Sequence, residues 1–492
     1  MGAQTDNRPN ILLIMADQCN PRFIGALGSD FAKTPHLDGL AERGTVLTNF
    51  YCNSPLCAPS RASMVTGRLV SNLGVYDNGA ELPASVPTIM HHLRRAGYET
   101  VLSGKMHFIG PDQLHGFARR LTTDIYPASF AWTPDWRAGL ARKETPRGIG
   151  DPGVVRWSTQ LSYDSEVHEH ALSAIREFGR MDAPAPFFLC VSYTHPHDPF
   201  AITQEYWDRY REVTVPPPTV PGQDPAMIHP FNRWIQARHG LNRFPPSEES
   251  ILLARRAYSA MVSYVDDLVG GLLAELSRWS LLERTLVIFT SDHGEMMGEH
   301  GMWYKRTIME DAVRVPFILS WPGVWHGGRR LDSTGSLIDL FPTLLEIAAV
   351  PEAEEAVHSA DGTSLTGLLS GSSPGKDEAV VEYCAEGVLH PAIAIRAGRY
   401  KYVFVKDNPC LLFDLVMDPH ERDNLADRRE SHGIQAMLHN KVDRKWIDGS
   451  LEKSILHSQR QRHWVREAMR SSRISWDYQP FVDASKQYRR DI

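Results

Sequence analysis

The chain has 492 residues, of which 42% are hydrophobic and 23% charged, as is ordinary for a globular protein. Its formal net charge of −7 gives no electrostatic reason to expect nucleic-acid binding. No apolar run approaches the roughly 20 residues of a transmembrane helix, so we expect no membrane span. The length predicts one large domain and a smaller one.

The N-terminal segment predicts a buried first strand. The apolar run Asn10–Ala16 follows a short polar stretch and ends at Asp17. A secretory signal would need a basic start, a longer apolar core and a small-residue cleavage site, so we expect a cytoplasmic location. The six cysteines are scattered and form no C-x-x-C pair. We therefore expect neither a disulfide framework nor a thiolate zinc site.

Apolar strands alternate with helices along the first part of the chain. The predicted core strands are Ile11–Ala16, Phe187–Ser192, Leu286–Thr290 and Phe317–Ser320. Between the middle two, apolar residues at steps of three and four predict a long helix containing Tyr258, Met261, Val265, Leu268, Leu272 and Leu276. This alternation indicates an α/β fold with a largely parallel sheet. Ligands of such folds gather beyond the carboxyl ends of the strands, where Asp17 and Ser291-Asp292-His293 stand.

A cluster of Gly, Ser and Pro at 370–377 predicts a domain boundary. We expect a catalytic domain over 1–375 and a smaller subdomain over 376–492. Short strand-like runs after the boundary predict a small antiparallel sheet, and the last fifty residues have a helical pattern. The runs are Ala379–Tyr383, Ala392–Arg396, Tyr400–Val405 and Leu411–Leu415.

The strongest local motif is Cys57-Ala58-Pro59-Ser60-Arg61, followed by Thr66-Gly67-Arg68. It resembles the C-x-P-S-R signature of the type I sulfatases. In that family a dedicated formylglycine-generating enzyme reads this segment and oxidises the cysteine to formylglycine. The resemblance implies this modification at Cys57. It also implies an alkaline-phosphatase-like α/β/α sandwich with a large, mostly parallel mixed sheet and a smaller C-terminal α+β subdomain.

The aldehyde suits the hydrolysis of a sulfate ester. Its hydrate has two hydroxyls on one carbon, and one of them attacks sulfur as the nucleophile. The other then loses its proton, the carbonyl re-forms and sulfate leaves. Water therefore never has to reach the sulfur atom.

A metal would lower the pKa of such a nucleophile and neutralise sulfate oxygens. The candidate ligands are Asp17, Cys57, Asp292 and His293, an oxygen-rich set with a single imidazole that suits one Ca²⁺ or Mn²⁺ ion. Many sulfatases have two consecutive acids where this chain has Asp17-Gln18, and Asn where it has His293. The pattern here resembles the branch of choline sulfatases and phosphonate monoester hydrolases. Whether Gln18 is a ligand stays open.

Cationic and histidine residues fill the remaining catalytic roles that the resemblance implies. Arg61, one helical turn past Cys57, would pair with the aldehyde hydrate or the sulfate. Lys105 would bind sulfate, and His107 would accept the proton when the carbonyl re-forms. His197 matches the leaving-group side and Lys305 the second sulfate-binding lysine, and either could be the leaving-group acid. His195, the neighbouring histidine in the same motif, is interpreted as structural.

Longer segments resemble choline sulfatases, including 102–107, 110–117, 121–127 and 476–480. A quaternary ammonium is bound by aromatic faces and an uncompensated carboxylate. The resemblance assigns these roles to Trp132 and Glu386, with Glu382 as the alternative carboxylate. The stretch after Trp136 lacks the Trp- and His-bearing sequence expected of choline sulfatases, so part of the substrate wall is expected to differ.

Three functions remain open on the sequence. The first is hydrolysis of choline-O-sulfate. The second is a broader aryl- or alkylsulfatase, or a phosphonate monoester or phosphodiester hydrolase, on the same core. The third is a non-catalytic relative that binds a sulfated ligand. The aromatic C-terminal tail predicts a packed contact, so we expect a homodimer or homotetramer.

Overall fold

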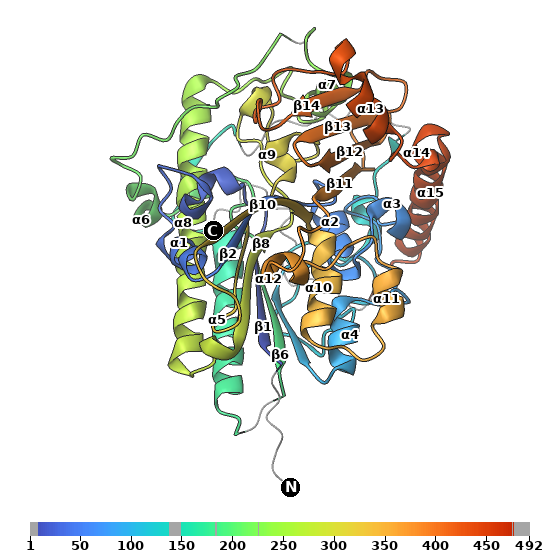
Figure 1. Ribbon diagram of the computed structural model, residues 1–492. Coiled ribbons are helices and arrows are strands. Elements are labelled where there is room, and N and C mark those ends of the chain that lie inside the picture. The colour runs from blue at the N-terminus through green and yellow to red at the C-terminus, as the bar shows by residue number, and fades with distance from the viewer. Residues whose placement is uncertain (1–7, 137–148, 183–184, 225, 475, 477–492) are drawn as a thin grey trace.

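A computed structural model describes residues 8–136, 149–182, 185–224, 226–474 and 476. Within these ranges an eight-stranded sheet has the order β10-β2-β9-β8-β1-β6-β3-β4, with helices on both faces (Figure 1). Its strands are β1 (Asn10–Ala16), β2 (Thr45–Tyr51), β3 (Glu99–Gly104), β4 (Arg119–Arg120), β6 (Phe187–Tyr193), β8 (Thr285–Ser291), β9 (Phe317–Ser320) and β10 (Arg329–Ser336). The predicted α/β fold is confirmed.

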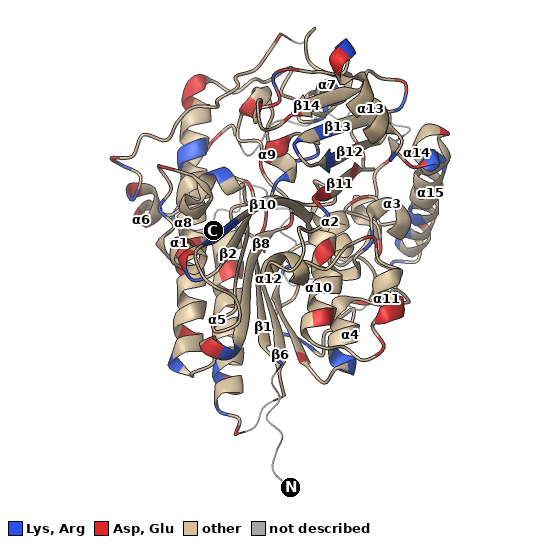
Figure 2. Cartoon of the chain, viewed as in Figure 1, with Lys and Arg blue, Asp and Glu red and all other residues tan. Residues whose placement is uncertain are grey.

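The centre of this sheet consists of uncharged strands buried along their whole length. Strands β1, β6 and β8 contain no charged residue and are drawn in tan in Figure 2. Parallel strands covered on both faces need such sequences, because neither face reaches water. Strand β9 is antiparallel to both β2 and β8, and the other pairings in the sheet are parallel.

Alternate residues of β1 enter two separate hydrophobic cores, as the two-residue period of a strand requires. Leu12 and Ile14 pack in the core that includes α5 (Thr159–Gly179) and α8 (Glu248–Arg278). Ile11 and Leu13 pack in the opposite core, whose helices are α2 (Cys57–Thr66), α4 (Ile89–Arg95) and α10 (Leu340–Ile347). The sheet is therefore the middle layer of an α/β/α sandwich.

Strand register brings the carboxyl ends of the central strands together. Ala16 pairs with Ser291, so Asp17 and Asp292 follow neighbouring positions of the ladder. On the other side of β1, Gly104 of β3 pairs with Ser192 of β6. The loops after all four strands consequently begin at one edge of the sheet.

The C-terminal part forms a four-stranded antiparallel sheet, as predicted. Its strands are β11 (Glu378–Tyr383), β12 (Ala392–Ala397), β13 (Tyr400–Val405) and β14 (Leu411–Asp414). A 22-residue helix, α15 (Ser450–Ser471), follows and lies along the outside of the molecule (Figure 1). The domain boundary at 375 stays a prediction.

The remaining helices are shorter and connect these layers. None of the helices in the described ranges combines the length and apolar character that a membrane span requires. Besides the helices already given, they are α1 (Pro35–Glu42), α3 (Val70–Leu73), α6 (Gln204–Asp208), α7 (Pro230–Arg238), α9 (Glu310–Val313), α11 (Glu354–His358), α12 (Thr366–Ser370), α13 (His432–His439) and α14 (Arg444–Ile447).

Candidate active site

Cys57 is the first residue of α2, and its side chain is buried at the edge where the strands end. The Asn78 side chain accepts a hydrogen bond from the Ala58 backbone N–H at 3.0 Å, which satisfies one of the free donors of the first helical turn. The positive end of the helix dipole favours negative charge near residue 57. The thiol of Cys57 stands here in the position of the formylglycine hydroxyls.

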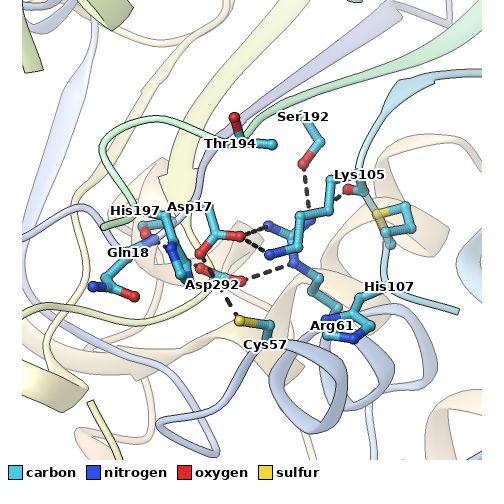
Figure 3. Close-up of polar contacts among 12 residues, drawn as sticks. Asp17, Gln18, Cys57, Arg61, Lys105, His107, Ser192, Thr194, His197 and Asp292 are labelled. Carbon is cyan, nitrogen blue, oxygen red and sulfur yellow. Dashed lines mark hydrogen bonds and ion pairs between the residues drawn. The ribbon is translucent and has the colours of Figure 1, made fainter. Parts of the chain in front are cut away.

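The four predicted metal ligands lie together. One ligand atom each from Asp17, Cys57, Asp292 and His293 lies within 4.8 Å of the others, and all four residues are buried. The Cys57 Sγ lies 3.2 Å from His293 Nε2. It lies 3.9 Å from Asp17 Oδ1 (Figure 3). The Gly294 carbonyl faces His293 Nδ1 at 3.1 Å, which leaves Nε2 free to bind an ion. These donors fit a divalent cation that prefers oxygen ligands.

Arg61 makes contacts that differ from the expected ones. Its Nε donates to Asp292 Oδ2 at 2.8 Å, and its terminal nitrogens donate to Ser192 Oγ and Asp17 Oδ2 (Figure 3). The guanidinium is fully buried. Arg61 therefore orients the two carboxylates of the predicted metal site, whereas the sequence suggested a direct contact with the aldehyde hydrate or sulfate.

Lys105 lies on the other side of Asp17. Its ammonium forms an ion pair with Asp17 and stands 4.5 Å from the centre of the Tyr126 ring. Burial and the nearby Cys57 raise the pKa of Asp17, but the neighbouring cations Lys105 and Arg61 help to hold it below its ordinary value. Asp17 is consequently ionised and ready to bind a cation.

Lys305 and His197 form a second group beside Cys57. The Lys305 ammonium donates to His197 Nε2 at 2.6 Å and lies 3.5 Å from Cys57 Sγ. The His197 Nδ1 lies 2.7 Å from the Asp198 carbonyl, to which it can donate. The two candidates for the leaving-group acid are thus joined by one hydrogen bond, and the choice between them stays open.

Gln18 connects this group to a buried acid that the sequence did not single out. Its amide oxygen accepts from Lys305, and its amide nitrogen donates to Glu295. Burial raises the pKa of Glu295 to about 7. Glu295 stands two residues after His293, and this closeness to the predicted metal ligands is the sequence feature that could have pointed to it.

An aromatic pair borders the histidine on the Lys105 side. The ring centres of Trp132 and Tyr126 are 4.9 Å apart, and each lies 5.3 Å from the ring of His107. Burial lowers the pKa of His107, so its imidazole is neutral and able to accept a proton. Trp132 was predicted. Tyr126 lies in the segment 121–127 that carried the resemblance, but received no role from it.

The two candidate carboxylates have partners in the structure. Glu386 forms ion pairs with Arg306 and, at 3.4 Å, with Arg238, although the sequence predicted an uncompensated charge. Burial raises the pKa of Glu386, but Arg306 and Arg238 lower it by a larger amount, so that the pKa is about 2. Glu382 is buried and accepts hydrogen bonds from the backbone and hydroxyl of Ser71. The expectation of an uncompensated carboxylate at Glu386 is therefore wrong.

The other histidine of the motif has the contacts of a structural residue. His195 is buried, and its Nδ1 lies 2.6 Å from Asp164 Oδ2. The divergent stretch after Trp136 falls largely at 137–148, outside the described residues, as does the tail beyond Trp476.

Residues 9–350 match the family Sulfatase. The chain therefore belongs to the sulfatase family and is a sulfuric ester hydrolase, as the motif at Cys57 predicted. Membership implies a formylglycine nucleophile and a divalent metal. Residues 298–448 match N-sulphoglucosamine sulphohydrolase, C-terminal, and residues 453–492 match Choline sulfatase enzyme C terminal.

Among individual proteins, the chain is 40% identical to a choline-sulfatase of Rhizobium meliloti, over 99% of this chain and 96% of that one. It is 29% identical to arylsulfatase K of Danio rerio, over 85% and 80% of the two chains. A crystal structure of a phosphonate monoester hydrolase of Agrobacterium radiobacter covers 91% of this chain and 96% of its own, with a TM-score of 0.69 and 26% identity.

Proposed function

We propose that this sulfatase hydrolyses choline-O-sulfate to choline and sulfate. The observation that carries the proposal is the aromatic pair Tyr126 and Trp132 beside His107, because aromatic faces attract quaternary ammonium groups. The 40% identity to a choline-sulfatase over nearly the whole of both chains supports the same substrate.

The charges around Cys57 favour an anionic ester. Arg61 and Lys105 form ion pairs with the carboxylates Asp17 and Asp292, and the Lys305 ammonium lies 3.5 Å from Cys57 Sγ. Lys105 and Lys305 would hold sulfate oxygens from opposite sides of residue 57, as electrostatic stabilisation of the transition state requires. Arg61 would act through the carboxylates that it orients.

Formylglycine at residue 57 would supply the nucleophilic oxygen. Asp17, Asp292, His293 and residue 57 would hold a divalent ion, which would lower the pKa of that oxygen. We propose Ca²⁺ or Mn²⁺, since the donors are mainly oxygens. Gln18 stays outside the proposed ligand set because its amide oxygen accepts a hydrogen bond from Lys305.

Proton transfers fall to residues on the two sides of Cys57. His107 would take the proton that is lost when the carbonyl re-forms, since burial keeps its ring neutral. On the other side, the hydrogen-bonded pair His197 and Lys305 would donate a proton to the departing alcohol oxygen. Either member of the pair could be the donor.

Recognition of the ammonium group would depend mainly on Trp132. Glu386 remains the proposed carboxylate partner, but its two arginine contacts already compensate its charge. We therefore expect Trp132→Ala to raise KM for choline-O-sulfate more than Glu386→Gln does. The reverse order would assign ammonium recognition to the carboxylate.

A substrate panel tests the proposed ester. Turnover of choline-O-sulfate should exceed that of p-nitrophenyl sulfate in kcat/KM, because only the former offers a cation to the aromatic pair. Equal values, or a higher value for the aryl ester, would contradict a choline-specific pocket and favour the broader sulfatase.

Mass spectrometry and substitution of Cys57 test the nucleophile. After co-expression with a formylglycine-generating enzyme, the peptide containing Cys57 should carry the aldehyde, and an intact thiol would favour a non-catalytic relative. Cys57→Ala should lower kcat by at least about 10³-fold without unfolding the protein. Cys384→Ala is the matched control, because Cys384 is equally buried but packs in the core of the small sheet. Retained activity of Cys57→Ala would rule out the covalent mechanism.

A phosphonate monoester hydrolase is the second candidate. It is favoured by the Asp17-Gln18 and Asp292-His293 pattern and by the 26% identity to the Agrobacterium radiobacter enzyme. A phenyl phosphonate monoester added to the panel tests it, and absence of turnover would exclude it. Cytoplasmic location and assembly as a homodimer or homotetramer are further proposals, which fractionation and sedimentation measurements can test.

A further inference from the structure

We propose that the C-terminal helix α15 acts on the leaving-group side of the active site through Arg462, which positions the segment carrying Trp132. The inference deepens the proposed function, since it rests on Trp132 as part of the wall for the alcohol. Arg462 is a positioning residue, whose guanidinium contacts Asp77 and Thr133.

The first observation is a buried bidentate ion pair between distant parts of the chain. Two guanidinium nitrogens of Arg462 donate to the two carboxylate oxygens of Asp77, at 2.6 and 2.7 Å. The side chain of Asp77 is fully buried and that of Arg462 is 7% exposed. Two parallel hydrogen bonds fix the orientation of both groups as well as their distance.

Asp77 belongs to a short segment that joins the catalytic helix to the Trp132 segment. The next residue, Asn78, accepts from the Ala58 backbone N–H in the first turn of α2. The following residue, Gly79, packs against the backbone beside Trp132, where an added Cβ would lie 2.4 Å from the Thr133 nitrogen. The segment 77–79 therefore sets the distance between the Trp132 backbone and the helix that begins at Cys57.

Helix α15 also holds the Trp132 segment directly. Gln459 accepts from the backbone N–H of Trp136 at 3.1 Å, and His463 Nε2 lies 2.9 Å from the Pro134 carbonyl. Arg462, which lies between Gln459 and His463 on the helix, has a guanidinium nitrogen 3.4 Å from the Thr133 hydroxyl. Three residues on one face of α15 thus contact three of the four positions that follow Trp132.

The consequence is a mechanical link from residue 462 to the ring of Trp132, which lies 5.3 Å from His107. If Asp77 lost its partner, segment 77–79 could shift and the Trp132 backbone would lose its support from Gly79. The leaving group would then bind in a less well defined position. The effect should appear in KM and should depend on the presence of the indole.

A double-mutant cycle in the full-length, formylglycine-containing protein tests this link. Trp132→Ala and Arg462→Met should each raise KM for choline-O-sulfate by about tenfold and change kcat by less than about threefold. The double variant should be no worse than Trp132→Ala alone, because Arg462 acts through the indole. Independent effects that multiply to about a hundredfold would overturn the proposal.

Two further variants guard against loss of folding, since Arg462→Met leaves a buried charge on Asp77. Arg462→Lys keeps the charge without the two-pronged geometry and should raise KM while the melting temperature stays close to that of the wild type. Gly79→Ala should also raise KM, because its added Cβ would displace the backbone beside Trp132. Wild-type KM values in both would overturn the proposal. Arg470→Met on the same helix is the control, since that side chain is 81% exposed.

The cycle separates this inference from the proposed substrate. If choline-O-sulfate is not hydrolysed, the proposed function fails. The same four proteins can then be compared on p-nitrophenyl sulfate, where non-additivity between Arg462→Met and Trp132→Ala would still support the link, and additivity would still exclude it.

Discussion

Two clusters of buried charge both contain acids paired with basic side chains, yet the acids of one cluster also lie beside a cysteine and a histidine. The interface cluster, between the small sheet and the large domain, consists of Tyr51, Glu310, Lys401 and Glu421. Lys401 lies 3.0 Å from Glu310 and 2.8 Å from Glu421, and Tyr51 donates to Glu310. Each charge there has a protein partner, as buried ion pairs require.

The site cluster, consisting of Asp17, Arg61, Lys105 and Asp292, is different. Its acids also lie close to Cys57 and His293, and one ligand atom from each of these four residues lies within 4.8 Å of the others. Lys305 adds a cation 3.5 Å from Cys57 Sγ. This arrangement becomes satisfied when a divalent ion and an anionic ester are present. The comparison indicates that buried acids lying beside a cysteine and a histidine suit a bound ligand, whereas buried acids that gather around one lysine hold two parts of the fold together.

The largest expected effect on stability comes from breaking the interface cluster. Lys401→Met leaves Glu310 and Glu421 buried together without their cation, which should cost about 3–5 kcal/mol. Chemical denaturation measures it. Lys376→Met is the control, because Lys376 is about half exposed and lies 4.0 Å from Glu378, so the loss there should stay below about 1 kcal/mol. Equal losses in the two variants would contradict the role given to the interface cluster.

Removal of metal should give a smaller effect, confined to the site cluster. A chelator should abolish activity and lower the melting temperature, since an ion present at a hundred times its Kd stabilises the folded state by about 2.7 kcal/mol. Asp292→Asn should make the melting temperature insensitive to the chelator. Adding Ca²⁺ or Mn²⁺ back separately would identify the ion. An unchanged melting temperature of the wild-type protein would contradict metal binding at these residues.

The smallest effect concerns Glu382, a buried acid that accepts its hydrogen bonds from Ser71. Burial raises its pKa from 4.5 to about 7. Below pH 4.5 Glu382 therefore does not lower the free energy of unfolding. As pH rises from 4.5 to about 7 it lowers this free energy progressively, and above about pH 7 the loss stays constant. Glu382→Gln should be stabilised relative to the wild type by about 1 kcal/mol at pH 8 and by less at pH 5. Unfolding curves at the two pH values, with Glu378→Gln as control, measure the difference.

The sequence predicted the elements that are governed by local patterns. Strands β1, β8 and β9 were found because continuous apolar runs form buried strands. Strand β10 was not predicted, since Arg329–Ser336 is polar and lies at the sheet edge, where burial imposes no such pattern. Metal-site geometry was predictable in part, because Asp17 and Asp292 follow strands that were recognised.

Contacts between distant residues were not predictable. The partners of Glu386 come from positions 80 and 148 residues away in the chain, so only the folded structure shows that its charge is compensated. Arg61 was expected to reach forward to the substrate, but the packing of α2 against the strand ends directs it to Asp292 and Ser192. The direction of such side chains depends on tertiary packing, which produces no periodic pattern in the sequence.

The pairing of Ala16 with Ser291 has a consequence for how this protein can change over evolutionary time. The predicted metal ligands Asp17 and Asp292 take their spacing from the pairing of β1 with β8, so substitutions that keep this register leave the spacing intact. The proposed wall for the alcohol comes from loops, which tolerate insertions and replacements more readily than strands do. Changes in these loops can therefore alter which alcohol is accepted, while the pairing of β1 with β8 keeps the predicted metal ligands in place.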